Sequence, residues 1–246
     1  SLFNKIEVIM RYFFTSLCTC FFVLCSAIGF AQEIDDAYVQ NILLSQDKRA
    51  IQKLLDDGLD VNSRDANGDT LLFYVLTRQL DFDTAQMLID AGADVNLPSN
   101  NGLTLLVFTT SIMREFQIKN KDFPKLNDEM QQAKITEQEN FLVSHTAKLL
   151  DFLLKNGADV NQDTPQGTAL MNASTNDLNI NLVKTLLASG AKVNQKDRLG
   201  RTALFYAEAF GSNSISTELL KSGADISIKD DNGQTYLDVS KFDILD

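Results

Sequence analysis

The sequence has a single histidine, His145, and no tryptophan, and its three cysteines all lie within the first 25 residues. After Cys25 there is no thiol that could form a disulfide, and His145 has no second histidine or cysteine with which to bind zinc or iron. We therefore expect no metal site and no cofactor. His145 itself falls in a segment with helical character, which favours a structural role.

Positive charge is also in short supply, with 22 Lys and Arg against 33 Asp and Glu and a formal net charge of −11. The basic residues are scattered along the chain, so they do not form the cluster that phosphate neutralisation requires. This pattern argues against nucleic acid as a partner. The hydrophobic fraction of 44% is enough to build a core and argues against global disorder.

Catalytic motifs are missing as well. No glycine-rich loop precedes a Lys-Ser or Lys-Thr pair, and there is no Gly-x-Ser-x-Gly elbow. Residues 65–69 and 230–233 superficially resemble calcium loops, but neither is followed by the bidentate glutamate of an EF-hand. The sequence therefore predicts a protein that is not an enzyme.

The N-terminal segment has the layout of a secretory signal peptide. Arg11 precedes an apolar stretch over residues 17–28, and the small residues Gly29 and Ala31 occupy the positions that signal peptidase reads. We expect residues 1–31 to comprise upstream residues and a signal peptide cleaved after Ala31. The mature chain would be exported to the periplasm or secreted, with no membrane insertion after cleavage.

Two alternatives to this cleaved leader stay open. The apolar stretch could be an uncleaved anchor or pack on the fold. A lipid anchor at Cys25 is also conceivable, although Leu24 is bulky where a small residue is expected before a lipidated cysteine.

A string of the form Leu-Leu-x-x-Gly-Ala-Asp-Val-Asn recurs five times. Successive glycines of the string are 34, 65, 33 and 33 residues apart, so one repeat contains an insertion of about one repeat length. The Leu pair is predicted to pack between neighbouring repeats near the end of a helix, and the glycine to end that helix in the left-handed conformation. The five glycines are Gly58, Gly92, Gly157, Gly190 and Gly223.

A second string follows most of these in register and has the form Asp-x-x-Gly-x-Thr; one copy reads Asn100-Asn101-Gly102-Leu103-Thr104. The acidic or amide residue and the glycine predict a tight turn, and the threonine two residues after the glycine predicts a helix N-cap. One copy is a residue short between Gly167 and Thr168, which predicts an irregular turn there. The capping threonines of the regular copies are Thr70, Thr104, Thr202 and Thr235.

Together the two strings resemble the ankyrin-repeat family over about residues 38–240. The resemblance implies an all-α ankyrin-repeat solenoid of stacked helix-turn-helix units with turn or hairpin fingers, five to six units including atypical caps. It implies one repeat domain over residues 32–246. The expected units cover about residues 33–63, 65–96, 99–161, 163–194, 197–227 and 230–246.

The insertion covers about residues 109–146. Its composition predicts two extended helices with a break at Pro124. One interpretation is that lengthened helices simply project a polar hairpin into solvent, and the other is that this hairpin contacts a specific partner.

The resemblance also implies a binding surface made of the finger tips and the exposed side of the first helix of each unit. Phe73 and Phe205 stand where the family commonly has a histidine, and core filling is their expected role. The candidate partner-binding residues are Asn67, Asp69, Tyr74, Asn101, Leu103, Gln166, Arg198, Arg201, Tyr206, Asp231, Asn232 and Gln234.

These features predict an exported scaffold that binds a protein partner and is monomeric alone. Two other functions stay open: an immunity or inhibitor protein that neutralises a secreted toxin or enzyme, and an enzyme with an unrecognised site. The insertion is the only segment that could hold such a site.

Overall fold

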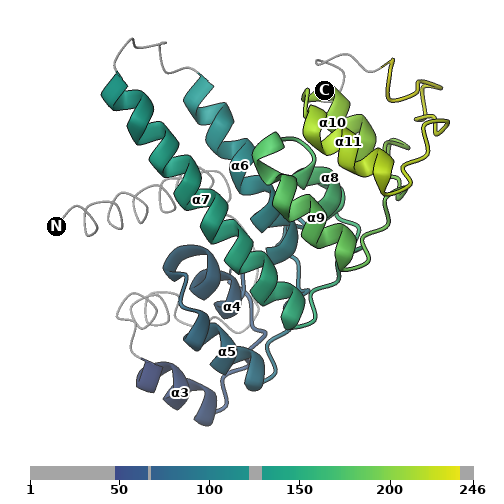
Figure 1. Ribbon diagram of the computed structural model, residues 1–246. Coiled ribbons are helices and arrows are strands. Elements are labelled where there is room, and N and C mark those ends of the chain that lie inside the picture. The colour runs from purple at the N-terminus through teal and green to yellow at the C-terminus, as the bar shows by residue number, and fades with distance from the viewer. Residues whose placement is uncertain (1–47, 66–67, 122–128, 239–246) are drawn as a thin grey trace, which may run out of the picture. The chain divides into compact units, whose positions relative to one another are not determined.

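The computed structural model describes residues 48–65, 68–121 and 129–238, with the backbone alone for residues 115–121 and 129–135 (Figure 1). The chain forms two compact units, Ser1–Asn100 and Asn101–Asp246. We call them the N-terminal unit and the C-terminal unit. The predicted leader, Asn67, Pro124 and residues 239–246 lie outside the described residues.

The described part of the N-terminal unit consists of short helices joined by tight turns. Helix α3 spans Lys48–Asp56, α4 spans Leu71–Tyr74 and continues into the π-helical turn η1 over Val75–Gln79, and α5 spans Phe82–Asp90. Helix α4 packs against α5, and both bury apolar side chains, so the pair forms one helix-turn-helix layer. Leu80 ends η1 in the left-handed conformation with φ of 53°.

Over residues 101–121 and 129–238, the C-terminal unit contains three helix pairs. Helix α6 (Leu105–Lys121) packs against α7 (Glu129–Lys155), α8 (Ala169–Ala173) against α9 (Ile180–Ala188), and α10 (Ala203–Ala209) against α11 (Asn213–Lys221). The short 3-10 turn η2 (Asp177–Asn179) precedes α9. The first helices of the pairs contact one another in the order α6, α8, α10, and the second helices in the order α7, α9, α11 (Figure 1).

This stacking confirms the predicted all-α class. Within residues 48–65, 68–121 and 129–238 the only β pairing is one isolated bridge between Arg64 and Thr70. The predicted insertion corresponds to the long helices α6 and α7, of 17 and 27 residues. No helix of the described part is long and apolar enough to cross a membrane.

Each recurring Gly-Ala string ends a helix as its sequence predicts. Gly190 has φ of 90°, its amide donates to the Leu187 carbonyl at 3.1 Å, and the next amide, of Ala191, donates to the Leu186 carbonyl at 3.0 Å. This pair of bonds satisfies helix carbonyls that would otherwise lack a donor. The same two bonds recur at Gly58, Gly92, Gly157 and Gly223.

The two leucines of the string differ in burial. Leu186 is fully buried together with Leu182 and Val183, whereas Leu187 is half-exposed. Successive helix positions are about 100° apart, so one apolar stripe covers the first leucine and leaves the second at its edge. The first leucine therefore packs as predicted, while the second, Leu187, is only half-buried. The buried first members are Leu88, Leu153, Leu186 and Leu219.

The asparagine that closes the string binds the following repeat. The Asn194 side-chain amide donates to the Gly223 carbonyl at 3.1 Å, and its carbonyl accepts from the Asp225 amide at 2.8 Å. Asn161 makes the same two bonds to Gly190 and Lys192, at 3.1 and 2.8 Å. Asn62 does so within the N-terminal unit. Each bridge joins one turn to the next.

Two of the predicted threonine caps are present: the hydroxyl oxygens of Thr70 and Thr104 accept hydrogen bonds from amides three residues on, at 3.2 and 3.3 Å. Thr168 of the short copy, which was not among the predicted caps, makes the same bond at 3.3 Å. Thr202 precedes α10 but makes no such side-chain bond. Thr235 starts no helix among the described residues; there the Asp238 carboxylate accepts from the Thr235 amide instead, at 2.9 Å.

We predict that Leu186→Ala lowers the free energy of unfolding by about 2 to 5 kcal/mol because it opens a cavity in the core. The adjacent Leu187→Ala is the matched control, and removing its half-exposed side chain should cost roughly 1 kcal/mol. Urea denaturation of the two variants measures the difference. Equal losses would contradict the assignment of a single buried leucine per string.

Candidate functional site

The fingers are the turns that carry the Asx-x-x-Gly-x-Thr string. In the C-terminal unit we call residues 101–104, 164–168, 197–202 and 230–235 the finger surface. Its exposed members include an apolar side chain, Leu199, which is 50% exposed. The predicted binding residues that are exposed on it are Asn101, Gln166, Arg198, Asp231 and Asn232, and those that are half-buried are Leu103, Arg201 and Gln234.

Adjacent fingers stack closely because glycine leaves room for the next one. A Cβ atom added to Gly200 would lie 2.8 Å from Oδ1 of Asp231, and the Asp231 amide donates to the Leu199 carbonyl at 3.0 Å. Gly102 faces Pro165 in the same way. These contacts hold the finger backbones in a fixed order, so their exposed side chains form a preorganised surface.

The short finger is irregular, as predicted. Thr164, and not Asp163, takes the position that aspartate has in the regular fingers, and its buried hydroxyl donates to the Gly167 carbonyl at 2.7 Å. The Gln166 side chain donates to the Asn101 carbonyl of the preceding finger at 2.9 Å. Two predicted residues, Asn101 and Gln166, are therefore brought together.

Two fingers carry an additional pair of side chains, which we call the Asp–Tyr clasps. In the C-terminal unit, Oδ2 of Asp197 accepts a hydrogen bond from the Tyr206 hydroxyl at 2.8 Å, and Oδ1 accepts from the Leu199 and Arg201 amides, both at 2.8 Å. The carboxylate thus fixes the finger and ties it to α10. Asp65 and Tyr74 form the same clasp in the N-terminal unit.

The two clasps have different charged neighbours. Arg78 lies over the Tyr74 ring, 4.4 Å from its centroid. Burial raises the pKa of Asp69 to about 6; the Asp65 charge raises it further, and Arg78 opposes the shift. The N-terminal clasp therefore combines two carboxylates with one arginine.

The C-terminal clasp has arginines instead. Burial, and then the bond to Asp197, raises the pKa of Tyr206, while the nearby charges of Arg201 and Arg114 oppose that shift. Arg114, from α6, also lies over the ring of Phe210, 5.1 Å from its centroid. The charges of two arginines from different repeats therefore act on Tyr206.

Comparison with known proteins places this geometry in a family. A family model for ankyrin repeats in three copies matches residues 141–230, and one for ankyrin repeats in many copies matches residues 41–89. The chain contains ankyrin repeats.

A solved ankyrin repeat domain from Acinetobacter baumannii AYE has a TM-score of 0.60 and 27% sequence identity to the chain. The match covers 82% of this chain and 89% of that one. No curated protein matches the sequence significantly. Ankyrin repeats generally mediate protein–protein interaction and typically serve as binding scaffolds rather than enzymes, so the fingers are the part of the fold to consider for binding.

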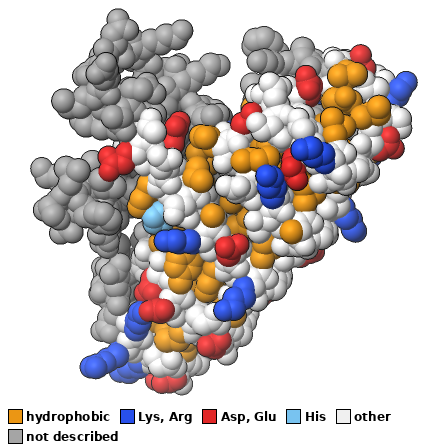
Figure 2. Space-filling view, in the orientation of Figure 1, with side chains coloured by type: hydrophobic (Ala, Val, Ile, Leu, Met, Phe, Trp, Pro, Cys, Tyr) orange, Lys and Arg blue, Asp and Glu red, His pale blue; other side chains and the backbone are white. Residues whose placement is uncertain are grey.

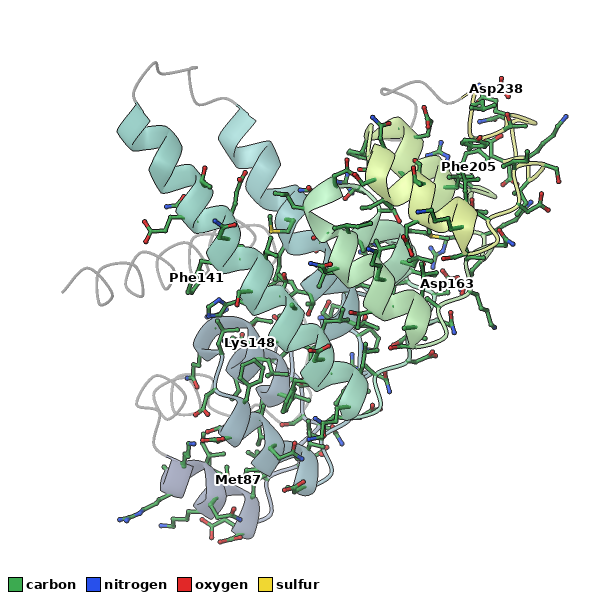
Figure 3. All side chains as sticks on the ribbon, viewed as in Figure 1. Met87, Phe141, Lys148, Asp163, Phe205 and Asp238 are labelled. Carbon is green, nitrogen blue, oxygen red and sulfur yellow. The ribbon has the colours of Figure 1, made fainter. Side chains whose placement is uncertain are left out.

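Several predicted residues have structural roles in these ankyrin repeats. Tyr74 is only 7% exposed and its hydroxyl is bound to Asp65, so it offers a partner little surface, contrary to the expectation of an aromatic anchor. Tyr206 is half-buried and tied to Asp197. Phe73 and Phe205 are buried, which confirms their predicted core role. Figure 3 labels Phe205, which belongs to α10.

Arg114 was missing from the residues predicted by the resemblance. It belongs to the long helix α6, which the sequence assigns to the insertion, and it reaches Tyr206 and Phe210 only through the fold. No local motif marks such a residue.

His145 belongs to α7, where its Nδ1 lies 2.8 Å from the Phe141 carbonyl and its ring 3.7 Å from the Phe141 ring. Figure 2 shows the histidine at the surface, where acidic and basic side chains are interspersed. The described residues contain no group of three or more His, Cys, Asp or Glu side chains that could hold a metal.

The raised pKa of Asp69 predicts a specific pH dependence. The ordinary value is 3.8 and the folded value about 6, so between these pH values the folded state holds a proton that the unfolded state has lost. This contribution stabilises the fold at the acidic end of the window and is lost as the pH rises through it. Asp69→Asn should therefore raise stability at pH 7 and flatten the profile between pH about 4 and about 6.

Thermal melts across that pH range measure the effect, with Asp57→Asn, an exposed aspartate of the same unit, as the control. If Asp69→Asn keeps the wild-type pH profile, the proposed proton linkage is wrong.

Proposed function

We propose that the protein is an exported ankyrin-repeat scaffold that binds a protein partner through its finger surface. The partner-binding residues of the proposal are those of the fingers that remain exposed or half-exposed in the C-terminal unit. The observation that carries it is the ordered stacking of the fingers, which presents polar side chains and the exposed Leu199 on a rigid backbone.

Rigidity supports this function because binding to a preordered surface loses little conformational entropy. Leu199 is well placed as an apolar contact, since its backbone carbonyl already accepts from the Asp231 amide while half of the residue is open. Its polar neighbours Arg198 and Asn232 supply the hydrogen-bonding rim that such interfaces have.

Export to the periplasm or the outside of the cell is part of the same proposal. It rests on the leader pattern of residues 10–31 and on the confinement of all three cysteines to that leader. A mature chain without thiols is indifferent to an oxidising compartment.

Site-specific photo-crosslinking tests the binding surface. A photoreactive phenylalanine derivative is placed at Leu199 on a finger or, as the matched control, at Leu220 on the second helix of the same repeat, which is 41% exposed. In cells we expect a discrete crosslinked protein from position 199 and none from position 220. Crosslinks from position 220 alone would place the interface on the opposite face and contradict the proposal.

A further inference from the structure

Within each unit, the glycine of a finger receives the tip of the following finger. A Cβ atom added to Gly102 would lie 2.5 Å from Cδ of Pro165, and one added to Gly200 would lie 2.8 Å from Oδ1 of Asp231. Gly233 has the same backbone conformation in the last described finger, with φ of 78°, but a Cβ atom added there meets no described atom within 4 Å. The place that a following finger occupies elsewhere is therefore open at Gly233.

A backbone acceptor of the last finger is open as well. The Leu199 carbonyl accepts from the Asp231 amide at 3.0 Å, and the Asn101 carbonyl, at the same place in its own finger, accepts from the Gln166 side chain at 2.9 Å. Asn232 has this place in the last finger, and no described residue donates to its carbonyl. Its oxygen can accept from a group outside the chain.

A basic side chain ties one finger to the next and has no such target at the end. Nζ of Lys196 donates to the Lys229 carbonyl at 3.0 Å, and Nη1 of Arg64 donates to the Pro98 carbonyl at 2.6 Å. Lys229 has this place in the last finger and is exposed. Its charge acts on Asp238, but the described hydrogen bonds to that carboxylate come from Thr235.

Two apolar side chains flank these groups. Ile226, three residues before Lys229, is 57% exposed, whereas the valines at its place in the earlier strings are buried or half-buried. Leu237, four residues after Gly233, is 70% exposed, whereas its equivalent Leu204 is buried. We call Ile226, Lys229, Asn232 and Gly233 the end socket.

The filled sockets of the same chain show which group fits the open one. Their occupants are Asn100 at Gly68, Pro165 at Gly102 and Asp231 at Gly200, and each is the second residue of a tight turn. The last finger already carries the carboxylates of Asp230 and Asp231, which disfavour a further aspartate by charge repulsion. Asparagine and proline are therefore the occupants that suit the end socket.

We infer that the end socket binds a tight turn of the partner protein with asparagine or proline at its tip. An amide of the turn donates to the Asn232 carbonyl, a carbonyl of the turn accepts from the Lys229 ammonium group, and a neighbouring apolar side chain covers Ile226. The inference rests on the proposed partner-binding function and adds the shape and chemistry of the bound segment. The partner extends the row of fingers by one, on a backbone that is already ordered.

The test uses the 15N-labelled protein and, as the probe, a cyclic peptide of residues 97–104, which form a finger of this chain. We expect the peptide to shift the Ile226 and Gly233 amide resonances saturably, and a cyclic peptide of the same residues in scrambled order to have no effect. Ile226→Ser should weaken binding roughly tenfold and Lys229→Gln roughly threefold. Lys196→Gln is the matched control and should leave the affinity unchanged, because that lysine already donates within the chain.

The absence of a saturable shift, equal binding of the scrambled peptide, or an affinity that Ile226→Ser and Lys229→Gln leave unchanged would overturn the inference. Two other occupants would also overturn it. Self-association in sedimentation velocity that Ile226→Ser abolishes would assign the socket to a second copy, and peptide binding that appears only after deletion of residues 239–246 would assign it to the chain itself.

Failure of this inference is distinguishable from failure of the proposed function. A crosslinked partner from position 199 together with no response to the cyclic peptide would retain the binding scaffold and remove only the docking of a turn at the end socket.

Discussion

The bridge made by the closing asparagine at positions 62, 161 and 194 is the interaction on which the order of the repeats within each unit depends. A single side chain occupies both an amide and a carbonyl of the next turn, as Asn194 does with Asp225 and Gly223. Because both partners are backbone groups, the bridge fixes the spacing of the turns whatever side chains the next repeat carries. The fingers follow those turns in sequence and inherit their spacing.

Position 227 lacks the bridging asparagine. It is the place of the closing asparagine in the last Gly-Ala string, but serine stands there, and its hydroxyl bonds locally to Asp225 at 2.6 Å. Each recurring position of the string thus has its own role: the glycine ends the helix, the asparagine positions the next turn, and one leucine fills the core.

Most of the fold was predictable because each of these roles needs a particular residue at a fixed spacing. Gly190 must adopt positive φ and Thr70 must cap a helix, and both requirements are visible in a single sequence. The sequence does not predict that Leu186 is more deeply buried than Leu187, because the position of the neighbouring helix decides which of two adjacent leucines faces the core.

The candidate site was less predictable than the fold. The finger positions of Arg198 and Arg201 follow from the repeat pattern, but Arg114 lies over Phe210 only because α6, α8 and α10 stack in that order. Contacts between repeats are set by tertiary stacking, and no window of sequence contains them.

The most direct test of the bridge is the replacement of Asn194 by alanine, measured by urea denaturation against Ser227→Ala. Asn194→Ala removes two hydrogen bonds to the next repeat, worth roughly 1 kcal/mol each, and we predict a loss of about 1 to 3 kcal/mol with a broader transition. Ser227→Ala removes only a local bond and should leave the curve nearly unchanged. Superimposable curves for the two variants would contradict the view that the asparagine bridge orders the repeats.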